Sequence, residues 1–395
     1  MTSDTTPRAR RTPRPWPVRL VGWLVALVLV GTAAAVIINR GSFGHTTHEV
    51  AATPLKDDHA ALAASVTPVH DFPADSYLVG PAVVTINDSG AVGHDPDSGE
   101  QAWRYTRTDT SVCAHHTEGT LVVLVYASGD RCDEAIGIDV RSGNRRWQRT
   151  IEATGKNTIV WNQGGFLSVD AAKMIAYENN QGYERFTLDN SVTDNIEGEH
   201  TSCENLAATG AHNVVTLQRC RATGNDPWAL QLVVTTASDG DSREVGRSYL
   251  TGIDDPQLID SLENGTAYVR DSAGTVRVYT AGAQDPTTVL GLPAMPEAVD
   301  VLSTRSGTVL SDGTTAFGLD NTGSHVAWST PIVAAPTLLG NDLYLPTEGA
   351  LQVRAADNGQ PTRSIAAPLA PGTTEVAVSG PRIGVRTDAG LVVLR

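Results

Sequence analysis

One short pattern recurs along the chain and constrains the fold more than any other feature. It consists of an acidic residue, a turn containing glycine, and an aromatic residue four positions after that glycine. Its clearest copies are Asp95 to Trp103, Asp139 to Trp147 and, in weaker form, Glu178 to Phe186, and each lies between two apolar runs. Glycine supplies the positive φ of a tight turn, and Asp or Ser side chains there bond to nearby backbone N–H groups. The pattern predicts a strand, a turn and a returning strand.

The apolar run before this turn recurs eight times, at a mean spacing of roughly 43 residues, and another apolar run precedes it in most units. Four strands of roughly five residues, with their turns, fill such a unit and form one blade of a β-propeller. Abundant Gly, Thr, Val and Ala with few aromatic residues also fit an all-β fold. We therefore expect an all-β, eight-bladed β-propeller over residues 61–395. The eight runs are 91–94, 135–138, 173–177, 230–234, 276–279, 315–319, 351–354 and 391–394.

The units also predict how the ring closes. The eighth unit reaches Arg395 directly after its third run, so its outermost strand has to come from elsewhere. The short run from Ser65 to Val69 precedes the first unit and has no blade of its own. If this N-terminal strand completes the last blade, no blade is left incomplete, and we expect the ring to close in this way.

The third run, the acidic turn and the aromatic residue together resemble the repeat of pyrroloquinoline-quinone-type (PQQ-like) eight-bladed propellers, of which membrane-anchored forms occur in actinobacteria. The resemblance covers roughly residues 62–395. It implies that the aromatic residue of a repeat docks between neighbouring blades. The residues that match this role are Trp103, Trp147, Phe186 and Trp328, the last of which lies one position further from its turn glycine than the others.

The same family contains quinone-dependent dehydrogenases, so an enzyme of this kind is the alternative to a binding function. Those enzymes typically show two adjacent cysteines, and carboxylate or amide ligands for a calcium ion beside the quinone. This chain has no adjacent cysteines, and its Asp57-Asp58 and Asp254-Asp255 pairs fall in expected loops, where carboxylates are usually solvated. The features of these enzymes are therefore missing, and a shared fold does not by itself imply a shared activity. We expect no cofactor, no metal and no enzymatic activity.

The N-terminal segment has the features of a membrane anchor. The stretch from Leu20 to Ile38 contains no charged residue and is long enough to span the hydrocarbon core. Arginines precede it, so the positive-inside rule predicts a cytoplasmic basic tail at 1–17, a transmembrane helix at 18–38 and an extracytoplasmic remainder. The alternative is a cleaved signal peptide with its site at 33–35, but the apolar run continues past that site, which favours an uncleaved anchor.

Residues 39–60 contain scattered Gly, Ser, Thr and Pro without a period, which is typical of a linker. His45 and His48 have the spacing of a metal-binding pair, but no cysteine or carboxylate partner completes the set, so we expect them to be solvated. His94 replaces an apolar strand residue and is expected to be a hydrogen-bonded core histidine.

The four cysteines all follow the expected anchor, where an exported segment meets an oxidising compartment. Aligning the units places Cys113 and Cys203 before an innermost strand, and Cys132 and Cys220 after a second strand. Of the three possible pairings, the repeat favours Cys113–Cys132 and Cys203–Cys220, because these positions open on the same face of a propeller. A zinc site is the alternative, but no Cys-x-x-Cys pair is present.

Charge and missing motifs exclude other functional classes. Six of the 29 basic residues but a single one of the 44 acidic residues lie in residues 1–40, so the remainder is strongly acidic and is not expected to bind nucleic acid. The chain contains no Gly-x-Ser-x-Gly and no phosphate-cradling glycine loop with lysine. His115-His116 is the strongest candidate in the sequence for a catalytic or metal-binding pair. We expect one of the two to face the channel and the other to pack.

These observations predict a non-enzymatic binding or scaffold propeller, anchored in a bacterial cell membrane and exposed outside the cytoplasm, with a cell-envelope protein as its partner. Long connections at Ala127–Glu134, Leu188–Ser202 and Arg221–Pro227 fall on the face expected to carry both disulfides. Loops on a rigid scaffold carry binding functions, so we expect the partner on that face. The alternative is that these loops tolerate insertion and the bridges resist proteolysis.

Overall fold

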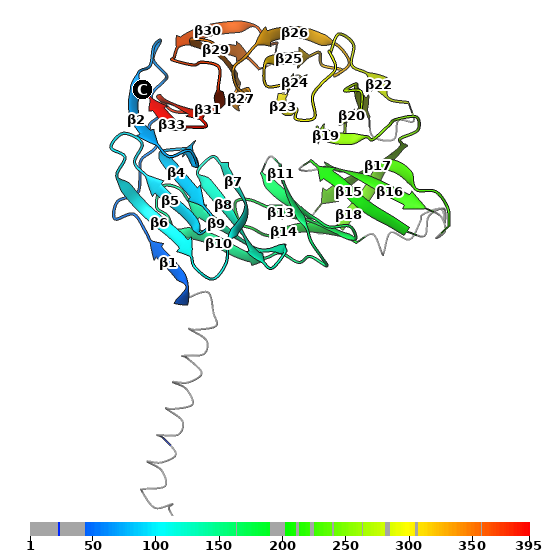
Figure 1. The fold of residues 1–395 in the computed structure, drawn as a ribbon, viewed down its shortest axis with the longest axis horizontal. Helices are drawn as coiled ribbons and strands as arrows, with labels where there is room; N and C mark the ends of the chain where they lie inside the picture. Colours follow the sequence, from blue (N-terminus) through cyan, green and yellow to red (C-terminus); the bar gives the residue numbers. More distant parts are fainter. Residues whose placement is uncertain are drawn as a thin grey trace, which may run out of the picture.

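The chain folds into a ring of eight antiparallel sheets (Figure 1). The computed structural model describes Trp23 and residues 44–162, 164–189, 202–210, 213–221, 225–238, 241–262, 264–280, 285–304, 307–356 and 358–395. Each sheet is one blade, which confirms the all-β, eight-bladed propeller. The expected basic tail (1–17) and transmembrane helix (18–38) lie outside the described residues apart from Trp23. Within the described residues, no helix combines the length and apolar character needed to cross a membrane.

In blades 1 to 4 the strands follow one another outward from the ring axis. Blade 1 contains β3 (Ser76–Val79), β4 (Ala82–Asn87), β5 (Gly90–His94) and β6 (Gln101–Arg107). Blade 2 contains β7 (Val112–Glu118), β8 (Leu121–Ser128), β9 (Arg131–Asp139) and β10 (Arg145–Thr150). Blade 3 contains β11 (Thr158–Asn162), β12 (Gly165–Val169), β13 (Lys173–Glu178) and β14 (Glu184–Asp189). Blade 4 contains β15 (Ser202–Thr209), β16 (Asn213–Arg221), β17 (Ala229–Ser238) and β18 (Asp241–Tyr249).

Blades 5 to 7 repeat this order, and blade 8 departs from it in its outermost strand. Blade 5 contains β19 (Gln257–Ser261), β20 (Ala267–Arg270), β21 (Val276–Tyr279) and β22 (Thr287–Thr288). Blade 6 contains β23 (Asp300–Thr304), β24 (Gly307–Ser311), β25 (Thr315–Leu319) and β26 (Val326–Pro331). Blade 7 contains β27 (Thr337–Leu339), β28 (Asp342–Thr347), β29 (Ala350–Ala355) and β30 (Pro361–Ala366). Blade 8 contains β31 (Thr373–Ser379), β32 (Arg382–Thr387), β33 (Gly390–Leu394) and β2 (Pro68–Phe72). All eight apolar runs that define the repeat are third strands.

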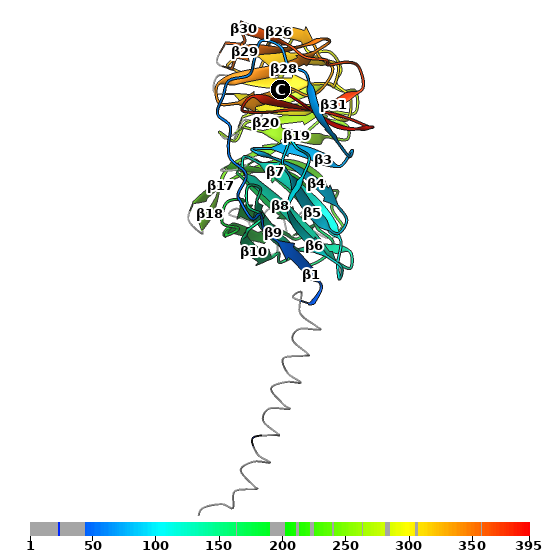
Figure 2. The same cartoon turned by 90° about the vertical axis from the view of Figure 1, so that its left-hand side faces the viewer.

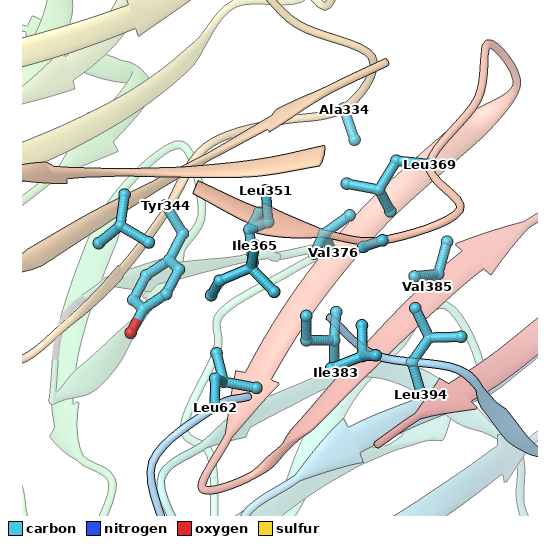
Figure 3. Packing of buried hydrophobic residues seen from close by; sticks show 13 residues of the cluster. Leu62, Ala334, Tyr344, Leu351, Ile365, Leu369, Val376, Ile383, Val385 and Leu394 are labelled. Carbon is cyan, nitrogen blue, oxygen red and sulfur yellow. The ribbon is translucent and has the colours of Figure 1, made fainter. Parts of the chain in front are cut away.

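The apolar core lies between blades rather than at one centre. In β8, Val122 and Leu124 pack toward blade 1, whereas Leu121 and Val123 pack toward blade 3. This alternation explains why the second strands read as continuous apolar runs, because both of their faces are buried. Each pair of neighbouring blades shares one such cluster, and Figure 3 shows the cluster between blades 7 and 8.

Blade 8 combines strands from the two ends of the propeller. β2 pairs antiparallel with β33 and is the outermost strand of that sheet, which places it beside blade 1 at the seam of the ring (Figure 1). The strand that completes blade 8 begins and ends about three residues later than the expected Ser65–Val69. Ser65 bridges Ala366 of blade 7, and pairing with blade 8 begins at Thr67, which exchanges two backbone hydrogen bonds of 3.0 Å with Arg395.

The segment expected to be a linker is built into the ring from residue 44 onward. β1 (Thr46–Glu49) pairs with β6 as a fifth strand of blade 1. The N–H groups of Ala51 and Leu55 then donate 2.9 Å hydrogen bonds to carbonyl groups in a turn of blade 2. We call residues 44–66 the N-terminal strap.

The strap continues across the seam to blade 7. The Val66 N–H donates to the Ala366 carbonyl at 3.0 Å, and the Ala366 N–H donates to the Ala64 carbonyl at 2.9 Å. Just before these anchor points, Leu62 is buried in the cluster shared by blades 7 and 8, where Figure 3 shows it with Ile365 and Ile383. In Figure 2 the blue chain rises from β1 toward the sheet of β28 to β30 before it returns as β2. The linker interpretation of this segment missed these contacts because their partners lie far away in the sequence.

Strand direction defines two faces of the ring. First strands begin, and second strands end, on the face that carries both disulfides, which we call the disulfide face. The turns between first and second strands, and between third and fourth strands, lie on the opposite face, which we call the turn face.

Candidate functional site

The recurrent acidic residue fixes the turn that follows each third strand. Asp95 Oδ1 accepts hydrogen bonds of 2.9 Å from the N–H groups of Asp97 and Ser98, and Gly99 follows with a φ of +73°. Asp139 makes the equivalent bonds in blade 2. The predicted turn chemistry is therefore present, and it places the turn glycine against the neighbouring blade.

Trp103 lies between its own blade and the turn glycine of blade 2. Its indole packs against Gly93 of blade 1 and Gly143 of blade 2, where a Cβ would come within 2.0 Å and 2.5 Å of the Trp103 side chain. The fully buried indole Nε1 donates a 2.7 Å hydrogen bond to the Val140 carbonyl of blade 2. Trp147 repeats this arrangement between blades 2 and 3. Two glycines create the slot, and the indole fills it while its polar N–H finds a partner.

The other two aromatic residues of the pattern also contact a neighbouring blade. Phe186 is buried with Ala208 and Val214 of blade 4. Trp328 packs against Gly318 of its own blade and Gly359 of blade 7.

A histidine occupies the corresponding position at the seam. In blade 1 the pairing of Gly93 with Trp103 follows a one-residue bulge, and in blade 8 the pairing of Val393 with His70 follows the same bulge. The His70 ring packs on Gly99, where a Cβ would come within 2.1 Å of Nε2. His70 therefore takes the place of a docking tryptophan. His70 holds the same position relative to the bulge of β2 as Trp103 holds relative to the bulge of β6, and this equivalence could have identified it as a docking residue. It is hard to recognise in the sequence, because β2 precedes the repeats and carries no turn motif.

Ion pairs supplement the seam on the turn face. Asp97 accepts hydrogen bonds from Nε and Nη2 of Arg382 at 2.9 Å and 2.6 Å, and from Nη1 of Arg395 at 2.8 Å. The Arg382 guanidinium holds the pKa of the Asp97 carboxyl below its usual value. Asp58 of the strap pairs with Arg395 at 2.9 Å, and Asp57 pairs with Arg141 at 3.0 Å. The expectation that Asp57-Asp58 is a solvated pair was wrong, because both carboxylates meet arginines from the ring.

Both disulfides join the predicted partners. Cys113–Cys132 links β7 to β9 with a Cα–Cα distance of 6.1 Å, and Cys203–Cys220 links β15 to β16 with a Cα–Cα distance of 4.2 Å. Each bridge closes within one blade, at the start of its innermost strand. The repeat alignment predicted this pairing correctly because equivalent positions in two units carry equivalent cysteines.

The long connections expected on this face differ from one another. Most of Leu188–Ser202 and part of Arg221–Pro227 lie outside the described residues. The third, Ala127–Glu134, is a hairpin rather than a loop, because β8 continues to Ser128 and β9 begins at Arg131.

His115 and His116 were expected to divide between the channel and the core, and this expectation was wrong. Both pack against neighbouring first strands, on opposite sides of β7. His115 Nε2 lies 3.1 Å from the Tyr77 hydroxyl of blade 1, whereas the His116 ring stacks on Trp161 of blade 3 with ring centroids 5.0 Å apart. Burial lowers the pKa of both imidazoles, which favours their neutral form. Adjacent residues of a strand point to opposite sides, which explains this arrangement.

The other histidines singled out from the sequence have polar partners as well. His48 Nε2 lies 2.8 Å from the Gly143 carbonyl, so the pair formed with His45 is not simply solvated. His94 Nδ1 lies 3.3 Å from the Gly99 carbonyl, as expected for a core histidine with a hydrogen bond. No group of three or more His, Cys, Asp or Glu that could hold a metal ion occurs within the described part of the chain.

Described residues of the first strands of blades 3, 4 and 5 line a partly open cavity of about 540 Å³. Its walls come from β11, β15, β19 and the turn before β13. Apolar walls include Trp161, Leu206 and Leu258, and the ionisable groups that line it are Lys156, Asp170 and Asp260. Its volume falls in the range of small-ligand sites, and its exposed lining is more polar than apolar.

Comparison with known proteins does not assign this chain to a family. No protein-family model matches the chain, and no curated protein sequence matches it. Among solved structures, BamB from Moraxella catarrhalis is similar at 13% identity, covering 83% of this chain and 99% of that one, with a TM-score of 0.43. The computationally designed Ika8 protein is similar at 14% identity, covering 86% and 99%, with a TM-score of 0.49. The C-terminal WD40 domain of Sif2 is similar at 10% identity, covering 85% and 98%, with a TM-score of 0.47. The architecture described above rests on the eight sheets of this chain, and we draw no functional conclusion from these similarities.

Proposed function

We propose that this protein is a non-enzymatic binding or scaffold propeller of a bacterial cell envelope, of PQQ-like repeat type and actinobacterial kind. Residues 18–38 anchor it in the cell membrane, and the propeller lies outside the cytoplasm. The observation that carries the proposal is the pair of disulfides, because bridges of this kind form and persist in oxidising compartments. The charge-free stretch behind an arginine-rich tail supports the orientation.

The disulfide face is the proposed surface for a protein partner. Both bridges hold the starts of first strands on this face, in blades 2 and 4. Ordering a surface before binding lowers the entropy cost of association, and cross-links order it. On the opposite face, the described turns at Gly99 and Gly143 already hold docking side chains, and the strap bonds to the turn of blade 2.

Topology and oxidation state test the proposal together. Alkaline phosphatase fused after Arg395 should be active, and peptide mapping without reductant should recover both linked cysteine pairs from membranes. Purification of the intact complex in mild detergent should bring down one stable envelope protein. An inactive fusion, or free thiols in the membrane-extracted protein, would overturn the export claim.

A further inference from the structure

The cavity between blades 3, 4 and 5 contains a carboxylate with an unused oxygen. Asp260 Oδ1 accepts a 2.6 Å hydrogen bond from the Thr209 hydroxyl and a 2.7 Å hydrogen bond from the Ser261 N–H. Asp260 Oδ2 has no hydrogen-bond partner among the described residues, and no described lysine or arginine pairs with this carboxylate. A half-buried charge without a counter-charge is costly, and a cation placed beside it would reduce that cost.

The other ionisable groups of the cavity do not supply a counter-charge for Asp260. The carboxylate of Asp170 accepts four hydrogen bonds from Thr154, Ala172 and Lys173. Lys156 precedes β11 and so lies toward the disulfide face, whereas Asp260 is near the end of β19 and lies toward the turn face. No ion pair joins Lys156 and Asp260 among the described contacts. Burial raises the pKa of the Asp260 carboxyl, and no cation opposes this shift.

The walls beside Asp260 suit a flexible alkyl chain with a charged end. Leu206 is 47% exposed in the cavity, which is unusual for a leucine on an innermost strand. Long basic side chains place methylene groups on apolar walls and keep the charge at a polar partner.

We infer that this cavity receives a lysine or arginine side chain of the partner protein, with its cation bound at Asp260 Oδ2. The inference deepens the proposed function and rests on it for the source of the cation. Because Asp260 lies toward the turn face, a partner on the disulfide face has to extend a segment into the channel and present its basic side chain at the depth of Asp260. An acidic propeller surface would also favour the approach of such a partner.

A matched pair of small probes tests the cavity without the partner. The detergent-solubilised full chain is titrated with N-acetyl-arginine amide and with N-acetyl-citrulline amide, which has nearly the same shape but no charge. We expect saturable binding of the arginine probe, roughly tenfold or more tighter than that of the citrulline probe. Asp260→Asn should remove this preference. Asp300→Asn should retain it, because Asp300 is another carboxyl whose pKa burial raises but does not line the cavity.

The outcomes test the cavity assignment and the proposed function separately. Equal affinity of both probes for the unaltered protein, or an unchanged preference in folded Asp260→Asn, would overturn the cavity assignment even if a partner co-purifies. A clear preference for arginine with no protein partner in the purified complex would support the cavity and count against the scaffold function. The comparison of probes on the unaltered chain keeps the test decisive if Asp260→Asn fails to fold.

Discussion

The substitution Asp97→Asn should lower the free energy of unfolding by about 2 kcal/mol, because it breaks the ion pairs at the seam between blades 8 and 1. Asp97 accepts three hydrogen bonds from Arg382 and Arg395 at 2.6 to 2.9 Å. Hydrogen bonds to charged groups contribute about 1.5–3 kcal/mol each when buried. Asp97 is 35% exposed, so solvent screens part of this, and asparagine keeps one acceptor oxygen. The remaining cost comes mainly from Arg382, which is 9% exposed and would lose its counter-charge.

The effect of this substitution should depend on pH in a defined direction. The Arg382 guanidinium lowers the pKa of Asp97 in the folded protein. A carboxyl with a lowered folded pKa contributes stability that is present above its unfolded pKa, about 3.9, and is lost as pH falls through the folded value. The difference between the unaltered protein and Asp97→Asn should therefore be full at pH 7 and shrink below about pH 4.

Urea unfolding of the detergent-solubilised chain, followed by tryptophan fluorescence, measures this difference. Asp71→Asn is the matched control, because Asp71 is exposed on β2 beside the same seam and has no ion pair among the described residues. The control should change stability by less than about 0.5 kcal/mol. If both substitutions have the same effect, or if the loss caused by Asp97→Asn stays constant down to pH 3, the ion pairs do not hold the seam.

Three further predictions address the other contacts of the ring, and thermal unfolding checks each. His70→Trp should lower stability by about 1–3 kcal/mol, because the residue opposite His70 is Val393 rather than the glycine that makes room for Trp103, and the larger ring would overpack the seam; an increase would show that the slot can widen. Gly143→Ala should cost more than about 3 kcal/mol, through contact with the neighbouring indole, whereas Gly129→Ala, with a similar φ of +67° and open space around it, should cost about 1 kcal/mol. Deleting residues 41–58 should lower the melting temperature because it removes β1 and two ion pairs, whereas removal of a true linker would leave it unchanged.

The repeat carried most of the sequence-based prediction. The third strands could be identified because an acidic turn and an aromatic residue mark their ends, and the same turn glycines form the docking slots for Trp103 and Trp147. The disulfide pairing could be predicted because two units carry cysteines at equivalent positions. These features depend on local patterns that recur, and a single sequence is sufficient to show them.

The seam could not be predicted in the same way. His70 replaces a tryptophan, so the pattern that marks other docking residues is absent there. The strap has no period, and its partners, such as Arg141 and Ala366, are distant in sequence. The side chains of the cavity come from three blades, and the sequence gives no sign that Trp161 and Asp260 line one space. Long-range geometry, rather than residue type, determines these features.

The strap also limits where a partner can approach. The His45 carbonyl accepts a 3.0 Å hydrogen bond from the Thr108 N–H, in the loop between β6 and β7, so the chain meets the ring at the rim of the disulfide face. If residues 18–38 span the membrane as proposed, only residues 39–43 separate the anchor from Gly44, and a fully extended chain of that length reaches roughly 20 Å. The rim of blade 1 must then stay within that distance of the bilayer. A partner on the disulfide face has to fit between this face and the membrane or be membrane-bound itself, and a soluble partner would meet the turn face first.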